Sequence, residues 1–238
     1  MKKKPTLVSI VLMLTFINLL VLALRNIIVG NDFYSFLRSN LFIGSLPVIV
    51  ISYLLYRFND KLSTVVFWAG TLLWVLFYPN APYMISDLIH DSQDPVSKLN
   101  PEMIKYDTLI IFSLAMLSVF YGFLSLKLMF TLFKERYSKR FAHIAIHATL
   151  ILSCLGFYMG RELLSAIKLG NGYLYSWEIF LEPIQIIKIV WKAIWPIQDN
   201  WTAYAMMALF GVVQYLLLVI FYYVNNIEAA PETKSIKA

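Results

Sequence analysis

Acidic residues and one histidine gather just after a double-proline segment, and their types and spacing could do chemistry. After Pro82 the pattern predicts a short amphipathic helix whose polar side carries Asp87, His90, Asp91 and Asp94, with Asp94 on a solvated rim. Such an oxygen-rich cluster could hold a divalent cation, and an Asp–His pair could act as general acid and base. An acidic, solvated loop whose first turn favours aspartate explains the same residues. We favour the loop and expect no metal and no cofactor.

Arg161 is a second candidate, because it follows an apolar span directly and a guanidinium beside hydrocarbon is costly unless it is paired. We expect an ion pair with Asp87, Asp107 or Glu178. The alternative is that Arg161 grips a phosphate or carboxylate of a lipid-like ligand.

The pocket for such a ligand would be walled by three aromatic residues, Tyr83, Tyr158 and Trp177. The candidate catalytic residues are Asp87, His90 and Glu178. The candidate ligand-binding residues are Asn80, Tyr83, Asp87, Asp107, Tyr158, Arg161 and Trp177.

His143 and His147 are four residues apart, the spacing of the two histidines in HExxH metal sites. The intervening residues are apolar, so the glutamate that acts as general base in such sites is missing. Two ligands alone do not close a metal site. We therefore interpret both histidines as packing residues.

The segment from Tyr78 to Tyr83 should turn rigidly. Pro79 and Pro82 lack an N–H and bias the residues before them away from the α region, so both prolines cannot lie in a helix interior. Asn80 can bond to backbone groups left open beside the turn. We expect this turn to end an apolar span at a membrane surface.

The composition points to the bilayer, with 60% hydrophobic residues, a mean hydropathy of +0.69 and 14% charged residues. A net charge of +6 spread this thinly does not indicate a nucleic-acid partner. The lone Cys154 excludes an intrachain disulfide.

Six segments approach the length of about 20 residues that spans a bilayer. The first is interpreted as a retained helix rather than a signal peptide, because its apolar run is long and no cleavage pattern precedes Arg25. The second could begin nearer Phe36. The predicted spans are Leu7 to Leu24, Leu41 to Tyr56, Leu62 to Tyr78, Thr108 to Phe130, Phe141 to Gly160 and Ala203 to Val224.

Polar and small residues within the spans predict helix packing. Asn18 and Gln214 can bond between helices, and Gly156 and Gly160 form a GxxxG ridge. No charge lies at the predicted centre of a span, which disfavours a transporter.

Basic residues in alternate loops predict the orientation. One side carries 12 of the 20 basic residues, including the dense group between Lys134 and Arg140. Both termini should then be cytoplasmic, and the acidic cluster should lie on the extracytoplasmic face.

The connection from Arg161 to Asn200 contains an amphipathic pattern over residues 184–195, ended by Pro196. It predicts a helix lying in the membrane surface, and a lid folded over the bundle is the alternative. Residues 225–238 have the composition of a disordered tail. Residues 1–224 should form a single transmembrane domain.

Several motifs together resemble a bacterial multi-pass membrane family known only as a domain of unknown function. The resemblance covers roughly Leu41 to Phe221, and its most specific part is the Pro-Asn-Ala-Pro-Tyr turn from Pro79 to Tyr83. It implies a bacterial cell-membrane protein and no particular reaction. Related chains tend to have an aspartate after the tryptophan, where this chain has Glu178. The other matching motifs are Ser86-Asp87-Leu88, Tyr106-Asp107, Gly156 to Arg161 and Ser176-Trp177-Glu178.

The predicted fold is an all-α integral membrane bundle of six helices with one interfacial helix. The predicted function is non-enzymatic: binding of a lipid-like or peptide ligand, or support of a membrane assembly, at the extracytoplasmic face. The alternative is an enzyme acting on a lipid-linked substrate through Asp87, His90 and Arg161. Clustering of these residues with Glu178 around one pocket would favour the enzyme. Membrane lipid is the expected partner, and the oligomeric state is left open.

Overall fold

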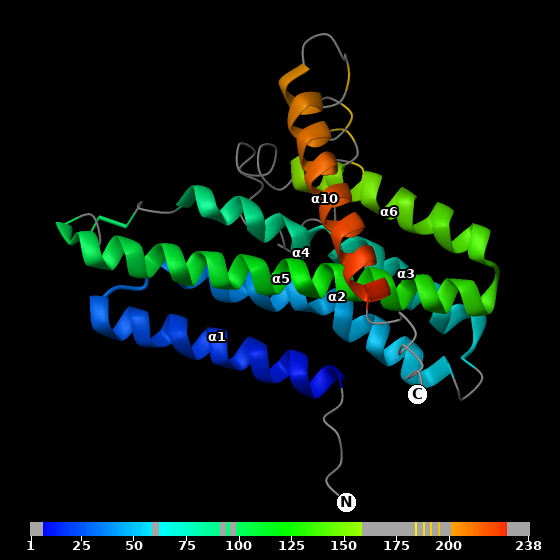
Figure 1. Cartoon of the computed structure of the whole chain (residues 1–238), viewed down its shortest axis with the longest axis horizontal. Helices are drawn as coiled ribbons and strands as arrows, with labels where there is room; N and C mark the ends of the chain where they lie inside the picture. The colour runs from blue at the N-terminus through cyan, green and yellow to red at the C-terminus, as the bar shows by residue number, and fades with distance from the viewer. Residues whose placement is uncertain are drawn as a thin grey trace, which may run out of the picture. The chain divides into compact units, whose positions relative to one another are not determined.

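The described part of the chain is helical, and it contains six helices long and apolar enough to cross a membrane, as predicted (Figure 1). The computed structural model describes residues 7–58, 62–90, 94–95, 99–158, 184, 188, 191, 195 and 201–227. The chain divides into two compact units, residues 1–157 and 158–238. The candidate site described below lies in the first unit.

Helix α1 (Leu7–Val29) extends past the predicted end at Leu24, so Arg25 belongs to the helix. The helix ends where Gly30 adopts a φ of +72°, a left-handed conformation that suits glycine, and its N–H donates to the Asn26 carbonyl at 3.0 Å. The 3-10 turn η1 (Phe33–Ser35) then leads into α2 (Phe36–Phe58), which begins at the earlier of the two predicted starts.

Helix α3 (Thr64–Phe77) is capped by Ser63, whose hydroxyl accepts from the Val66 N–H at 3.3 Å. Beyond it the chain does not make the exposed turn that we expected. It continues as the short helix α4 (Asn80–Tyr83) and the 3-10 helix η2 (Met84–His90).

The two prolines are compatible with this helical path because a new helix, α4, begins between them at Asn80. Pro79 is the N-cap of α4 and Pro82 lies in its first turn, where an N–H has no partner within the helix. Tyr78, directly before Pro79, keeps helical angles against our expectation. Tyr78, Ala81 and Met84 are all 0% exposed, so this segment is part of the unit's interior.

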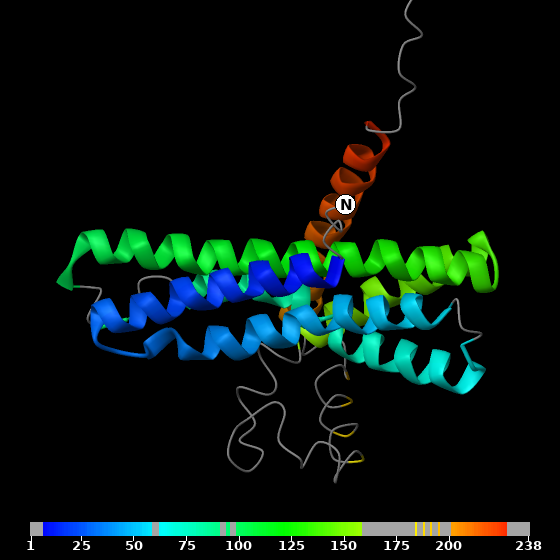
Figure 2. The same cartoon turned by 90° about the horizontal axis from the view of Figure 1, so that it is seen from below.

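Helix α5 (Pro101–Arg136) is the central helix of the unit. Asn100 caps it by accepting from the Glu102 N–H at 3.0 Å, and Pro101 occupies the first position, where proline is favoured. Its 36 residues make it about 54 Å long, longer than the predicted span 108–130. Of its most apolar stretch 61% is buried, against 17% for α1. Figures 1 and 2 show α1 and α2 running along it.

Helix α6 (Lys139–Tyr158) packs close to the double-proline segment because glycines remove side-chain bulk. A Cβ added at Gly156 would lie 2.8 Å from the Pro79 Cβ, and one at Gly122 of α5 would lie 3.1 Å from the Ala81 Cβ. Gly156 therefore acts as a packing residue, as predicted. Gly160 lies outside the described residues.

Helix α10 (Trp201–Ile227) is the long helix described in the second unit, and it continues past the predicted end at Val224, so residues 225–227 are helical. The rest of the predicted tail lies outside the described residues, as does most of the predicted interfacial helix. Within that helix, the Trp195 N–H donates to the Trp191 carbonyl at 2.8 Å, the bond of a helical turn. Its place relative to a membrane stays a prediction.

Candidate functional site

A buried arginine, which sequence reasoning missed, holds the acidic end of the first unit together. Arg25 is 0% exposed and binds Asp107 with two parallel bonds, from Nε to Oδ1 at 2.8 Å and from Nη2 to Oδ2 at 3.0 Å. Its Nη2 also pairs with Oδ2 of Asp94. A bidentate guanidinium–carboxylate pair is both strong and geometrically specific. Arg25 therefore joins α1 to α5 and to the segment after η2.

Asn31 and Tyr34, which follow α1 in the sequence, complete the arrangement. The Arg25 Nη1 donates to Oδ1 of Asn31 at 2.6 Å, and the Asn31 amide donates to both oxygens of Asp94 at 3.2 and 3.1 Å. The guanidinium lies over the Tyr34 ring, 4.7 Å from its centroid. We call these five residues the Arg25 cluster: Arg25, Asn31, Tyr34, Asp94 and Asp107.

The local sequence explains why this turn can reach Arg25. Gly30 reverses the chain after α1, and Oδ1 of Asn31 also accepts from the Phe33 N–H at 3.2 Å, which fixes the start of η1. The Tyr34 hydroxyl then donates to the His90 carbonyl at 3.1 Å. The cluster is thereby connected to η2 through the backbone.

Further along α1 from Arg25, two more polar side chains bond to α5. Oδ1 of Asn18 accepts from the Ser113 hydroxyl at 2.8 Å, and Thr15 bonds to the Tyr121 hydroxyl at 2.9 Å. Both partners are on α5, so the interpretation of Asn18 as a residue that packs helices is confirmed. Together with Arg25 these contacts hold one face of α1 against α5.

Asp87 and His90, the candidate acid–base pair, each contact a residue of α2. Oδ2 of Asp87 accepts from the Asn40 amide at 2.8 Å, and Asp87 is only 1% exposed. The His90 ring packs edge-on against Phe36, with centroids 5.1 Å apart. The 3-10 geometry of η2 also replaces the predicted α-helical face.

The prediction that Asp94 lies on a solvated rim is wrong, because Asp94 is 1% exposed. Its carboxylate is drawn inward by Arg25, a partner distant in sequence. Asp107, a predicted ligand-binding residue, is buried in the same cluster. Asp107 is therefore paired with Arg25, and the predicted ion pair of Arg161, which lies outside the described residues, stays a prediction. Asp91 lies outside the described residues.

The other predicted site residues are spread over the unit or lie beyond the described part. The Asn80 amide donates to the Phe77 carbonyl at 3.0 Å, a backbone group beside the prolines, as expected. The Tyr83 ring lies 6.0 Å from that of Phe157. Tyr158 is the last residue of α6 and is half-buried. Three residues are outside the described range, so their roles stay predictions: Arg161, Trp177 and Glu178.

His143 and His147 are stacked 6.5 Å apart, and His143 packs against Phe130 at 4.9 Å. Both histidines are exposed. Among the described residues, no three His, Cys, Asp or Glu side chains are grouped closely enough to hold a metal ion.

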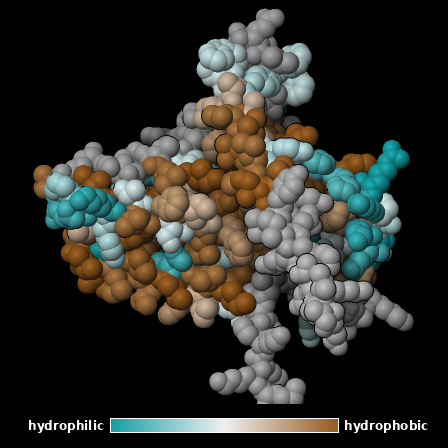
Figure 3. All heavy atoms as spheres, viewed as in Figure 1, coloured by the Kyte–Doolittle hydropathy of each residue, from teal (hydrophilic) through white to brown (hydrophobic). Residues whose placement is uncertain are grey.

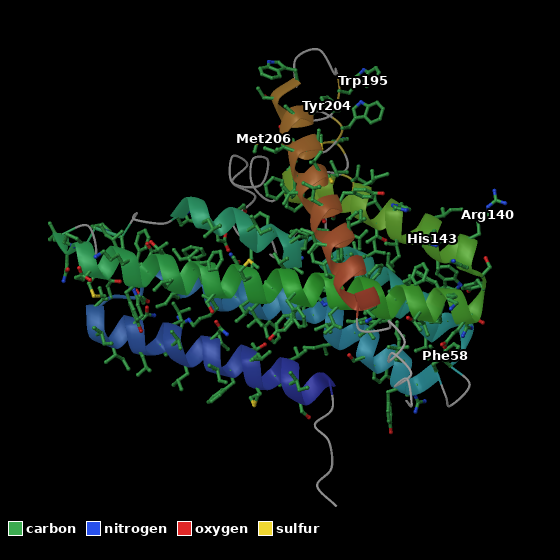
Figure 4. All side chains as sticks on the ribbon, in the orientation of Figure 1. Phe58, Arg140, His143, Trp195, Tyr204 and Met206 are labelled. Carbon is green, nitrogen blue, oxygen red and sulfur yellow. The ribbon has the colours of Figure 1, made fainter. Side chains whose placement is uncertain are left out.

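The opposite end of the unit is basic. Arg136 donates to the Leu62 carbonyl at 3.3 Å and to the Thr64 hydroxyl at 3.2 Å, so it fastens the end of α5 to the start of α3. Figure 4 places Phe58 and Arg140 at this end, and Figure 3 shows hydrophilic side chains at both ends of α5 with hydrophobic ones between. This distribution is typical of a unit that crosses a bilayer.

Six apolar helices, five of them in a unit with polar ends, define the class as a multi-pass membrane protein. The chain belongs to a family described as a protein of unknown function, DUF1361, whose model matches residues 39–217. The predicted resemblance to an uncharacterised family is confirmed. No curated protein and no solved structure matches the chain. Helix α1, with Arg25, precedes the matched region, whereas Asp94 and Asp107 lie within it.

Proposed function

We propose that this chain is a non-enzymatic membrane protein that binds a lipid-like ligand at the end of the first unit that carries the Arg25 cluster. The supporting observation is that the charged groups there are buried and bonded to one another: Arg25, Asp94 and Asp107 are each no more than 1% exposed. Groups held in this way build a fixed platform. They are poorly placed to exchange protons with a substrate.

The surface beside the cluster supports a lipid-like ligand. Ile27 and Ile28 at the end of α1 are 76% and 66% exposed, Phe33 of η1 is 40% exposed, and Leu99 before α5 is 87% exposed. Apolar side chains around a buried polar cluster favour acyl chains over a strongly charged partner. A peptide ligand is the alternative outcome.

The enzymatic alternative gains no support from the described contacts. The carboxylate of Asp87 is bonded to Asn40, and the His90 ring packs on Phe36. We further propose that the protein resides in a bacterial cytoplasmic membrane with both termini in the cytoplasm. The separation of acidic and basic ends along α5 supports this orientation.

The proposal can be tested by lipid co-purification. The full chain would be purified in mild detergent beside two variants, Phe33→Ser and Leu99→Ser, and a matched control at the opposite end, Tyr56→Ser, which replaces a residue that is 73% exposed. We expect the wild type and Tyr56→Ser to retain one enriched lipid class that the two variants lose. An identical lipid content in all four proteins would contradict lipid binding at this end, and a retained peptide would favour the alternative.

A further inference from the structure

Three polar side chains on one side of the α3 segment are buried without a hydrogen-bond partner in the described part of the chain. They are Thr71, Trp74 and Tyr78, spaced by three and four residues, and their exposed fractions are 6%, 0% and 0%. The rings of Trp74 and Tyr78 are 5.6 Å apart. This spacing places the three polar groups along one helix face that is turned into the unit.

A fourth group joins them from α5. Ser118 is 0% exposed, and its hydroxyl also has no partner among the described residues. This hydroxyl is directed at Gly44 of α2, beside Ala81. One turn further along α5, Gly122 lies against both Ala81 and the Tyr78 ring. We call these four residues the polar seam: Thr71, Trp74, Tyr78 and Ser118.

The double-proline segment adds an acceptor to this region. Pro79 has no N–H, so it cannot donate to the Val75 carbonyl four residues earlier. In membrane helices, backbone groups opened by proline are satisfied by side chains, neighbouring helices or ordered water.

Leaving such groups unsatisfied destabilises the folded protein, because each buried donor or acceptor has lost its hydrogen bonds to water and gains none in return. The indole of Trp74 can only donate, whereas the three hydroxyls can donate and accept. A ligand of the seam must therefore accept at least one bond and offer others. Water meets this requirement, and a buried water typically makes about three bonds.

We propose that the polar seam is an internal hydration site, in which ordered water bonds to Trp74 Nε1 and the Tyr78 hydroxyl and bridges them to the other seam groups at the proline break. The inference is independent of the proposed lipid binding, because the seam residues belong to α3, its C-cap and α5, and none of them is in the Arg25 cluster.

A crystal structure of the full chain that resolves ordered solvent tests this directly. We expect water within hydrogen-bond distance of Trp74 Nε1 and of the Tyr78 hydroxyl. A dry seam, or a protein acceptor on the Trp74 indole, would overturn the proposal.

Two nearly isosteric variants give a second test in solution. Tyr78→Phe and Thr71→Val remove the polar atom and keep the shape, with Tyr53→Phe and Thr131→Val as controls at exposed positions. If water is bound, each seam variant should lower the folded-to-unfolded ratio by about fivefold, since it removes one satisfied bond and leaves its water partner buried. Seam variants that are as stable as the controls, or more stable, would show that the seam is dry and overturn the proposal.

Discussion

At the scale of single residues, the main finding is how Arg25 is accommodated. Its guanidinium contacts Asp107, Asp94, Asn31 and the Tyr34 ring, so a charge inside an apolar helix is paired. Removing one member of a buried ion pair costs about 3–5 kcal/mol, because the remaining charge stays buried without compensation. The stability of the whole first unit should therefore depend on this cluster more than on any exposed ion pair.

Asp94 and Asn80 provide a comparison at this scale. Asp94→Ala should destabilise the protein by about 3–5 kcal/mol, because it removes a partner of the buried guanidinium. Asn80→Ala should cost about 1 kcal/mol, the typical value of a neutral hydrogen bond such as the one that Asn80 donates to the Phe77 carbonyl. Thermal unfolding of both purified variants, together with their abundance in membranes, measures the difference. This order reverses the one that a solvated Asp94 would give, and equal losses would contradict the burial of Asp94.

At the scale of the elements, the double-proline segment is the centre of packing in the first unit. Gly44 of α2, Gly122 of α5 and Gly156 of α6 all lie within close contact of residues 79–82. Because glycines on three helices converge on one short segment, the segment can be buried although it carries two prolines. Its helical course explains how apolar packing continues from α3 into η2.

Gly156 tests this packing. A Cβ at Gly156 would lie 2.8–2.9 Å from the Pro79 ring, which cannot move without its backbone, so Gly156→Ala should destabilise the protein by about 1–3 kcal/mol. Gly70→Ala is the comparison, because its Cβ would meet the Leu54 side chain, at 2.6 Å from Cδ2 and 3.0 Å from Cδ1 and Cγ, and a leucine side chain can shift more easily than a proline ring. Thermal unfolding should show a larger loss for the first variant than for the second. A stable Gly156→Ala protein would mean that α6 packs more loosely against Pro79.

Long apolar helices could be predicted from the sequence, whereas the details of the site could not. Hydropathy alone located all six spans, since a bilayer requires about 20 apolar residues. The local bias of Pro79 and Pro82 predicted a turn, but tertiary packing overrode it. Arg25 was missed because it lies just beyond the predicted end of α1, and its partners Asp94 and Asp107 are distant in sequence. The available signal was one arginine interrupting an apolar run that continues to Val29.

At the scale of the whole molecule, polar groups separate along the length of the first unit. The Arg25 cluster and Asp87 lie at one end, and Arg136 with its basic neighbours lies at the other. The positive-inside rule then predicts that the basic end faces the cytoplasm.

Reporter fusions test this orientation. Fusions after Arg140 should report a cytoplasmic location, and fusions after Ser97 should report the opposite side. The physical reason is that short loops rich in lysine and arginine stay on the cytoplasmic side of the membrane. This loop carries Lys134, Arg136, Lys139 and Arg140. The reverse pattern of reporter activity would move the proposed ligand-binding end to the cytoplasm.

The central claim is that Arg25 locks α1 to the family-matched part of the chain, and a double-mutant cycle between Arg25 and Asp107 tests it most directly. The variants Arg25→Met, Asp107→Asn and their combination would be compared by unfolding of the purified full chain. The exposed pair Lys105–Glu102, 2.9 Å apart, serves as the control and should show a coupling close to zero. We predict a favourable coupling of about 2–3 kcal/mol between Arg25 and Asp107. A coupling no larger than that of the control pair would contradict the lock.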